Sequence, residues 1–309
     1  MLSILIMYAI NASTFCFKKL LLESWSPFWL ASINTLLSGV LLLAYEYFCQ
    51  YKQGPITKKL LSRLLPASLC IMYGAALLRM YALSYISPSI VAFFGALDPF
   101  IAASLAYLIK KEKLTGLQMI GILLATVGAL PLLAAHNPGI TTGLNISQFL
   151  SLPALAGLAS VVVNRYGWIL MHERIHEKDS LNSSMYSMGF LTALMMFMGG
   201  TVSLGTAAIF ERLSFASFSW MSFALFIYLL ITNSICCTMY ASQVNKYGVT
   251  LLTLTEFFNP LFAAFYAWLF LKEPITAKFI LSSMVVLGGL FAFSYTELAK
   301  HFKHQKRSV

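Results

Sequence analysis

The sequence predicts an all-α polytopic membrane protein, with ten transmembrane helices arranged as two inverted five-helix repeats. Three observations lead to this fold class: the composition, a series of long apolar segments, and an internal repeat. Of the 309 residues, 59% are hydrophobic and only 10% are charged, against about 25% charged in a typical soluble domain. A soluble fold of this size has too little interior to bury that much apolar side chain, so lipid must surround most of the chain.

The apolar segments are each about 20 residues long, the length that crosses the hydrocarbon core of a bilayer. Short polar loops separate them, so that consecutive helices are expected to pack antiparallel. The predicted spans are residues 2–22, 27–48, 63–84, 88–109, 115–135, 148–172, 183–208, 218–243, 248–271 and 276–297.

The net charge of +10 does not indicate nucleic-acid binding, because the basic residues lie in short runs between apolar segments and in the C-terminal tail. Short loops rich in Lys and Arg face the cytoplasm. This rule places both termini in the cytoplasm and the loop 136–145 outside, in what we expect to be a bacterial inner membrane. Lys18 and Lys19 depart from the pattern, because they lie at the outer end of the first span. They either snorkel to the lipid headgroups, or Lys18 faces a polar interior.

The internal repeat aligns two stretches of the chain at one constant offset, without gaps. Matches between apolar residues are common by chance, whereas matched polar residues at one offset are rare. The offset pairs Asp98-Pro99 with Asn259-Pro260, Lys111-Glu112 with Lys272-Glu273, and Thr115 with Thr276.

A duplicated unit of five helices must enter the membrane from opposite sides in its two copies. Inverted repeats of this kind are typical of secondary transporters, although a duplicated scaffold without a transport role is the alternative. The expected domains are residues 1–137 for the first repeat, 146–297 for the second, and 298–309 for a basic cytoplasmic tail.

The repeated segments carry a resemblance to a known family. The run "ALSYISPSIVAFFGALDPF" from Ala82 and the run "EFFNPLFAAFYAWLFLKEPIT" from Glu256 resemble the EamA-type unit of the drug/metabolite transporter superfamily. The resemblance covers the last three helices of each half. It implies ten helices with both ends cytoplasmic, and transport of small metabolites such as amino acids, amines, nucleotide sugars, nucleobases or S-adenosylmethionine.

Four ionisable residues lie within predicted spans, where a charge at membrane depth costs about 2.5–3.5 kcal/mol on insertion scales and marks a polar interior. They are Arg79, Asp98, Arg165 and Glu256. Asp98 and Arg79 lie at depths that allow a salt bridge between neighbouring helices; alternatively, Arg79 binds a carboxylate or phosphate of the substrate. Arg165 is expected to snorkel to the inner interface.

Further polar residues complete the expected substrate site. The prolines after Asp98 and Asn259 each leave one carbonyl without its helical donor, which allows a bend beside a carboxylate or an amide. Asn11 and Asn164 lie on the first helix of each half, and Tyr240 offers an aromatic face with a polar tip. The predicted substrate-binding residues are Asn11, Arg79, Asp98, Asn164, Tyr240, Glu256 and Asn259.

These features predict a secondary transporter that moves a small polar metabolite by alternating access. The expected partners are that substrate, the lipid bilayer and, where Asp98 or Glu256 carries a proton, a coupling proton. No cofactor or metal is expected, because the sequence has no Walker motif and its cysteines and histidines lack metal-ligand spacing. The alternative is a membrane-embedded enzyme acting on a lipid-linked substrate, which would need a clustered acid–base or metal set.

Overall fold

The structure of the chain is a computed structural model that describes residues 2–49, 54–110, 116–134, 151–176, 186–212, 219–247, 256, 258–274, 277, 279–290 and 292. All of the regular secondary structure in these ranges is helical. In chain order the helices are α1 (Leu2–Leu21), α2 (Pro27–Cys49), α3 (Lys58–Ser68), η1 (Leu69–Gly74), α4 (Ala75–Tyr85), α5 (Pro88–Ala96), α6 (Asp98–Lys110), α7 (Gly116–Ala134), α9 (Leu152–His176), α10 (Met188–Phe210), α11 (Trp220–Tyr247) and α13 (Phe258–Leu271).

Seven helical stretches of the described residues are long and apolar enough to cross a membrane. They correspond to the first four predicted spans and to the sixth, seventh and eighth. The fifth predicted span coincides with α7, and the last two coincide with the shorter apolar helices Phe258–Leu271 and Phe279–Leu290. The protein is therefore a multi-pass helical membrane protein, while the count of ten and the inverted arrangement remain predictions.

The third predicted span begins earlier than the hydropathy pattern indicates. Thr57 caps the helix, its Oγ1 accepting a hydrogen bond from the Leu60 amide at 3.2 Å, so that α3 starts at Lys58 instead of residue 63. Pro66 then removes one backbone donor, and the helix widens into the π-helical turn η1 before continuing as α4. Such π-turns are frequent at functional sites, and this one lies five residues ahead of Arg79.

The helix is interrupted beside Asp98-Pro99, where the sequence predicts that it can bend. Helix α5 ends at Ala96, and α6 begins at Asp98. At the intervening Leu97, the amide bonds to the Phe94 carbonyl at 3.1 Å, and the Leu97 carbonyl accepts the Phe100 amide at 3.1 Å. The break places the Asp98 carboxylate in the first turn of a new helix, buried inside the bundle.

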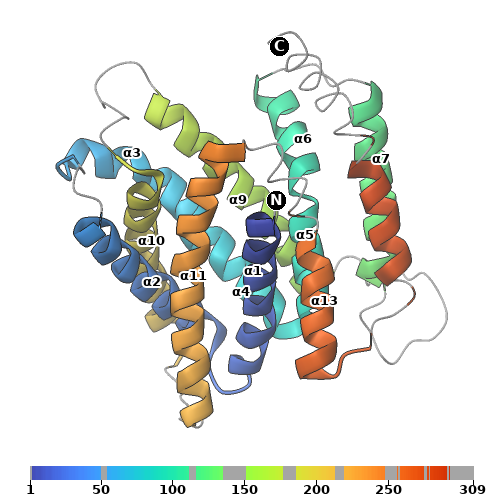
Figure 1. Cartoon of the computed structure of the whole chain (residues 1–309), viewed down its shortest axis with the longest axis horizontal. Helices are drawn as coiled ribbons and strands as arrows, with labels where there is room; N and C mark the ends of the chain where they lie inside the picture. Colours follow the sequence, from blue (N-terminus) through green and yellow to red (C-terminus); the bar gives the residue numbers. More distant parts are fainter. Residues whose placement is uncertain are drawn as a thin grey trace.

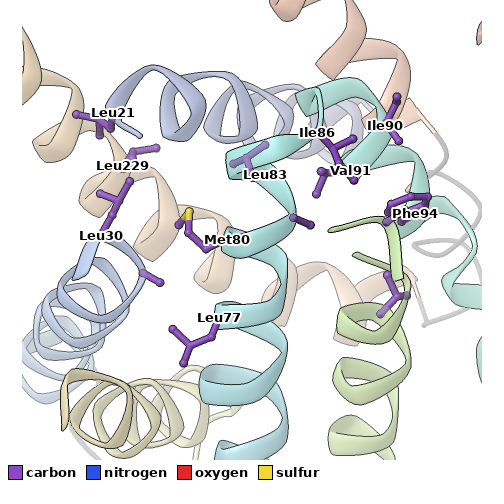
Figure 2. Packing of buried hydrophobic residues seen from close by; sticks show 14 of the residues in the cluster. Leu21, Leu30, Leu77, Met80, Leu83, Ile86, Ile90, Val91, Phe94 and Leu229 are labelled. Carbon is purple, nitrogen blue, oxygen red and sulfur yellow. The ribbon is translucent and has the colours of Figure 1, made fainter. Parts of the chain in front are cut away.

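Helix α1 stands at the centre of the bundle, between α11 and α13 (Figure 1). Its lower end packs into a large apolar cluster that also involves α2, α4, α5, α9 and α11. Leu77, Met80 and Leu83 of α4 line one side of this cluster, near Leu30 of α2 and Leu229 of α11 (Figure 2). This apolar packing brings the middle of α1 and the middle of α4 into the same interior.

Helices α2 and α10 pack against each other most closely. A Cβ added to Gly39 of α2 would lie 2.8 Å from the Phe197 amide nitrogen, and one added to Gly200 of α10 would lie 2.7 Å from the Leu36 Cα. Ser32 and Ser203 hydrogen-bond across the same contact at 2.5 Å. Small residues of this kind let two membrane helices bring their backbones together.

Substituting Gly39 or Gly200 with alanine should therefore destabilise the protein by about 1–3 kcal/mol, because the added methyl group meets backbone that cannot move aside easily. Equilibrium unfolding in detergent measures the loss. Gly205→Ala on the same helix α10 is the matched control, since a Cβ there has no neighbour within 4 Å. The control should be neutral or stabilising by up to about 1 kcal/mol; an equal loss at Gly205 would contradict this account of the contact.

Candidate functional site

A buried ion pair joins the two halves of the chain. The Arg165 guanidinium of α9 donates to Asp98 of α6 through Nε at 2.9 Å, and its second nitrogen forms an ion pair with the other carboxylate oxygen. The two side chains are only 17% and 7% exposed. This fork-shaped pairing fixes the relative position of the two side chains.

The pair corrects two expectations. A salt bridge between Asp98 and Arg79 was one of two interpretations of their depths, and Arg165 was expected to extend to the inner interface. Instead α9 packs against α5 and α6, which brings Arg165 to the Asp98 carboxylate. The depth argument compared only helices that follow one another in the sequence, whereas α9 comes from the other half of the chain.

Arg79 lies partly buried on α4, and the charged residues within its electrostatic range are Lys18 of α1 and Glu256. It forms no ion pair with any residue in the part of the chain that the structure describes.

Glu256 is a helical residue just ahead of α13 and lies inside the protein. Its carboxylate is within electrostatic range of Arg165 and Arg79, and also of Tyr8 on α1 and Tyr240 on α11. Residues from at least three separate helices and from both halves thus converge on one carboxylate. The predicted site residues Arg79, Tyr240 and Glu256 belong to a single cluster.

Asn11 and Asn259 meet where α1 crosses α13. Asn259 Nδ2 donates to Asn11 Oδ1 at 3.4 Å, and Asn11 also interacts with Cys236 of α11. Asn259 is only 6% exposed, and its Oδ1 has no hydrogen-bond partner among the described residues. Fully buried Ala12 and Ala263 let these two helices approach closely, and Ala92 of α5 packs in the same cluster.

Asn164 is not hydrogen-bonded to this cluster within the described ranges. It is partly buried on α9, next to Arg165, and no hydrogen bond of its side chain is found within the described ranges. Tyr240, by contrast, lies beside Trp168 of α9, with ring centroids 6.5 Å apart and planes inclined by 41°. The Tyr240 ring, which lies within electrostatic range of Glu256, is therefore flanked by a second aromatic ring from α9.

Four residues of the cluster were missed as site residues by sequence reasoning: Tyr8, Lys18, Arg165 and Trp168. A signal for two of them was present in α1. Tyr8, Asn11 and Lys18 are separated by three and seven residues, so that they lie on one face of the helix. A polar stripe on an otherwise apolar central helix indicates the interior of a bundle.

The described residues contain no group of three or more His, Cys, Asp and Glu side chains that could hold a metal ion. Cys16, Cys70, Cys236 and Cys237 are free. Helix α9 continues to His176, so His172 and His176 both belong to this helix. What the interior offers is charged groups of both signs, amides and aromatic rings.

Comparison with known proteins gives matches over nearly the whole chain. The model of the EamA-like transporter family matches residues 1–134 and 151–295. A protein of Chlamydia trachomatis serovar L2 named S-adenosylmethionine/S-adenosylhomocysteine transporter is 25% identical over 290 residues, covering 90% of this chain and 84% of its own length. A protein of the same name from Chlamydia muridarum is 24% identical over 284 residues, with coverages of 90% and 86%.

Two further matches extend the comparison. The protein described as uncharacterized transporter YoaV of Bacillus subtilis is 22% identical over 263 residues and covers 84% of each chain. A solved structure, described only as the crystal structure of a protein, superposes with a TM-score of 0.65 at 14% identity, covering 97% of both chains. This superposition establishes the similarity of the fold alone.

Proposed function

The chain belongs to the EamA-like transporter family, and on that premise we propose that it moves a small amphiphilic metabolite of the S-adenosylmethionine and S-adenosylhomocysteine type across the membrane by alternating access. The observation that carries the proposal is the charged and aromatic cluster around Glu256, assembled from both halves inside the bundle. A metabolite of this type presents an aromatic base, cationic groups and a carboxylate. The cluster offers aromatic rings, a carboxylate and guanidinium groups to match them.

The Glu256 region suits the cationic part of such a substrate. A sulfonium or ammonium group is attracted by a carboxylate and by the faces of aromatic rings. Glu256 supplies the carboxylate, Tyr8 and Tyr240 supply aromatic rings within its electrostatic range, and Trp168 packs beside Tyr240. The adenine ring would stack on the same aromatic groups.

Alternating access between two inverted halves is supported by reciprocal contacts between α2 and α10. Near the end of α2, Glu46 accepts a hydrogen bond of 2.6 Å from Ser187, which caps the start of α10. At the end of α10, Glu211 accepts hydrogen bonds from the Phe28 and Trp29 amides at the start of α2, at 2.9 and 3.3 Å. In both contacts, a glutamate at the end of one helix meets the start of the other helix. A pseudo-twofold axis that exchanges α2 with α10 would relate these two contacts to each other.

The wider packing supports the same relation. Helix α1, which opens the first half, packs on α11 of the second half, and α9, which opens the second half, packs on α3 and α4 of the first. The two stretches matched by the family model also run close to the two predicted repeats. We place the protein in a bacterial inner membrane with both termini in the cytoplasm, as the loop charges indicate.

Counterflow in proteoliposomes tests the proposal. Vesicles loaded with unlabelled S-adenosylhomocysteine should accumulate radiolabelled S-adenosylmethionine from a trace outside concentration, because exchange lets the internal pool drive entry of the label. Protein-free vesicles and vesicles loaded with adenosine are the controls. Labelling no higher than in protein-free vesicles would overturn the assignment of this substrate type.

A further inference from the structure

The charged residues of the interior follow one another in a definite order. Asp98 pairs with Arg165, Arg165 lies within electrostatic range of Glu256, Glu256 within range of Arg79, and Arg79 within range of Lys18. The signs alternate along this series until its end, where two cations are neighbours. At their ordinary charges, the three cations and two anions of this series carry one net positive charge, and the two neighbouring cations lie at its Lys18 end.

The position of Lys18 follows from the contacts of the residue after it. The ammonium group of Lys19 donates to the Leu83, Ser84 and Ile86 carbonyls at the end of α4, at 2.7, 3.0 and 3.3 Å. This bond holds the last turn of α1 against α4. Arg79 lies one turn before Leu83 on the same face of α4, and Lys18 lies one residue before Lys19 on α1.

The two neighbouring lysines therefore have different environments. Lys19 satisfies the free carbonyls at the end of a helix, which is a structural role. Lys18 is partly buried between α1 and α11, near Cys236 and Cys237, neither of which supplies a counter-charge as a thiol. Within the described ranges, neither Lys18 nor Arg79 forms a hydrogen bond or an ion pair, so that two adjacent cations keep their binding capacity.

We propose that Lys18 and Arg79 form an anion subsite that binds the carboxylate of the transported metabolite. The inference rests on the proposed function and adds the orientation of the substrate. Two neighbouring cations inside a membrane protein repel each other and lose hydration, and a bound carboxylate relieves both costs. The amino-acid end of the substrate lies toward Lys18, and its aromatic base lies toward Tyr8 and Tyr240.

The dimensions of α1 agree with this orientation. Tyr8 and Lys18 lie on one face and are ten residues apart, which corresponds to about 15 Å along the helix axis. Asn11 lies between them and can contact the middle of a ligand bound along this face. An extended nucleoside with an amino-acid side arm has its base and its carboxylate at opposite ends, so that both ends can be bound at once.

The first test needs no transport and uses sulfate as the probe. In detergent, sulfate should raise the melting temperature of the wild-type protein more than chloride does at equal ionic strength, and Lys18→Met should abolish this difference. Lys18→Met should also melt higher than wild type without sulfate, because it removes an uncompensated buried cation. Lys19→Met is the matched control: it should melt lower, since it loses the cap on α4, yet keep the response to sulfate.

An equal sulfate response in wild type and Lys18→Met, or none in either, would overturn the anion subsite whatever the protein transports. The sulfate test and the counterflow assay can also give different answers. A response that depends on Lys18, together with failure of the counterflow assay, would retain the subsite and reject the proposed substrate type.

The second test identifies which part of the substrate Lys18 and Arg79 bind. Binding of S-adenosylhomocysteine should weaken about 10- to 100-fold in Lys18→Met and in Arg79→Gln, the usual effect of losing one hydrogen bond between charged groups. The decarboxylated analogue, S-adenosyl-3-thiopropylamine, should bind the variants and the wild type within about 3-fold of each other. Equal losses for both ligands would place the carboxylate elsewhere and contradict the proposed orientation.

Discussion

Replacing Arg165 with glutamine should destabilise the protein by about 3–5 kcal/mol, because the Asp98 carboxylate would then remain buried without its partner. The side chain of Asp98 is only 7% exposed, and its two oxygens contact the same guanidinium. Asp98→Asn should also destabilise the protein, since Arg165 loses the carboxylate that it contacts directly and keeps only Glu256 within electrostatic range. Equilibrium unfolding in detergent measures both, and transport should fall with the folded fraction.

The double variant Asp98→Asn/Arg165→Gln should be less destabilised than either single variant, because it leaves no lone buried charge. Arg79→Gln combined with Asp98→Asn is the matched control. Since Arg79 does not pair with Asp98 in the structure, the effects of these two changes should add. Additive losses for Asp98 and Arg165 would show that each residue acts separately, and would contradict the role of the ion pair.

Replacing Glu256 with glutamine should weaken binding of S-adenosylmethionine about 10- to 100-fold, because the amide keeps the shape of the side chain but loses the charge that attracts the sulfonium. Binding of S-adenosylhomocysteine, whose sulfur is neutral, should change much less. Titration with the two ligands measures the difference directly. Glu256→Asp, which keeps the charge on a shorter side chain, is the matched control and should retain the preference for the cationic ligand.

The same variant separates substrate binding from proton coupling. If Glu256 carries the coupling proton, transport driven by a pH gradient should vanish in Glu256→Gln while exchange of substrate persists. If Glu256 binds the cationic substrate, exchange should fail as well. A variant with both activities intact would reduce Glu256 to a structural hydrogen-bonding residue and reject both roles.

Much of the helical architecture could be predicted because the bilayer imposes one length and one polarity on each crossing segment. The stretches that became α1, α2, α10 and α11 are recognisable from apolar runs of about 20 residues. The break before Asp98 is readable from Pro99, whose missing donor acts locally. Hydropathy did not predict the early start of α3 because the first turn of this helix is basic. The hydrogen bond from the Leu60 amide to Thr57 nevertheless starts the helix at Lys58.

The partners of the buried charges could not be predicted in the same way. Hydropathy and helix depth identified Arg79, Asp98 and Glu256 as interior residues, but they describe each helix separately. The choice of Arg165 as the partner of Asp98 follows from the packing of α9 on α5 and α6, a contact between residues 67 positions apart. Lys18 was an exception to the charge rule, and its interior position was only one of two alternatives until α1 was placed against α4.

The sequence by itself determined that this chain is a multi-pass helical membrane protein, that it resembles EamA-type transporters, and that a few charged residues lie at membrane depth. These properties depend on composition and on short-range periodicity, which each segment carries alone. Only the tertiary structure decided which charges neutralise each other and which remain available to a ligand. Two charges pair strongly only when they lie about 3–4 Å apart, and that distance depends on how helices from the two halves pack. The sequence pattern of a single helix does not determine it.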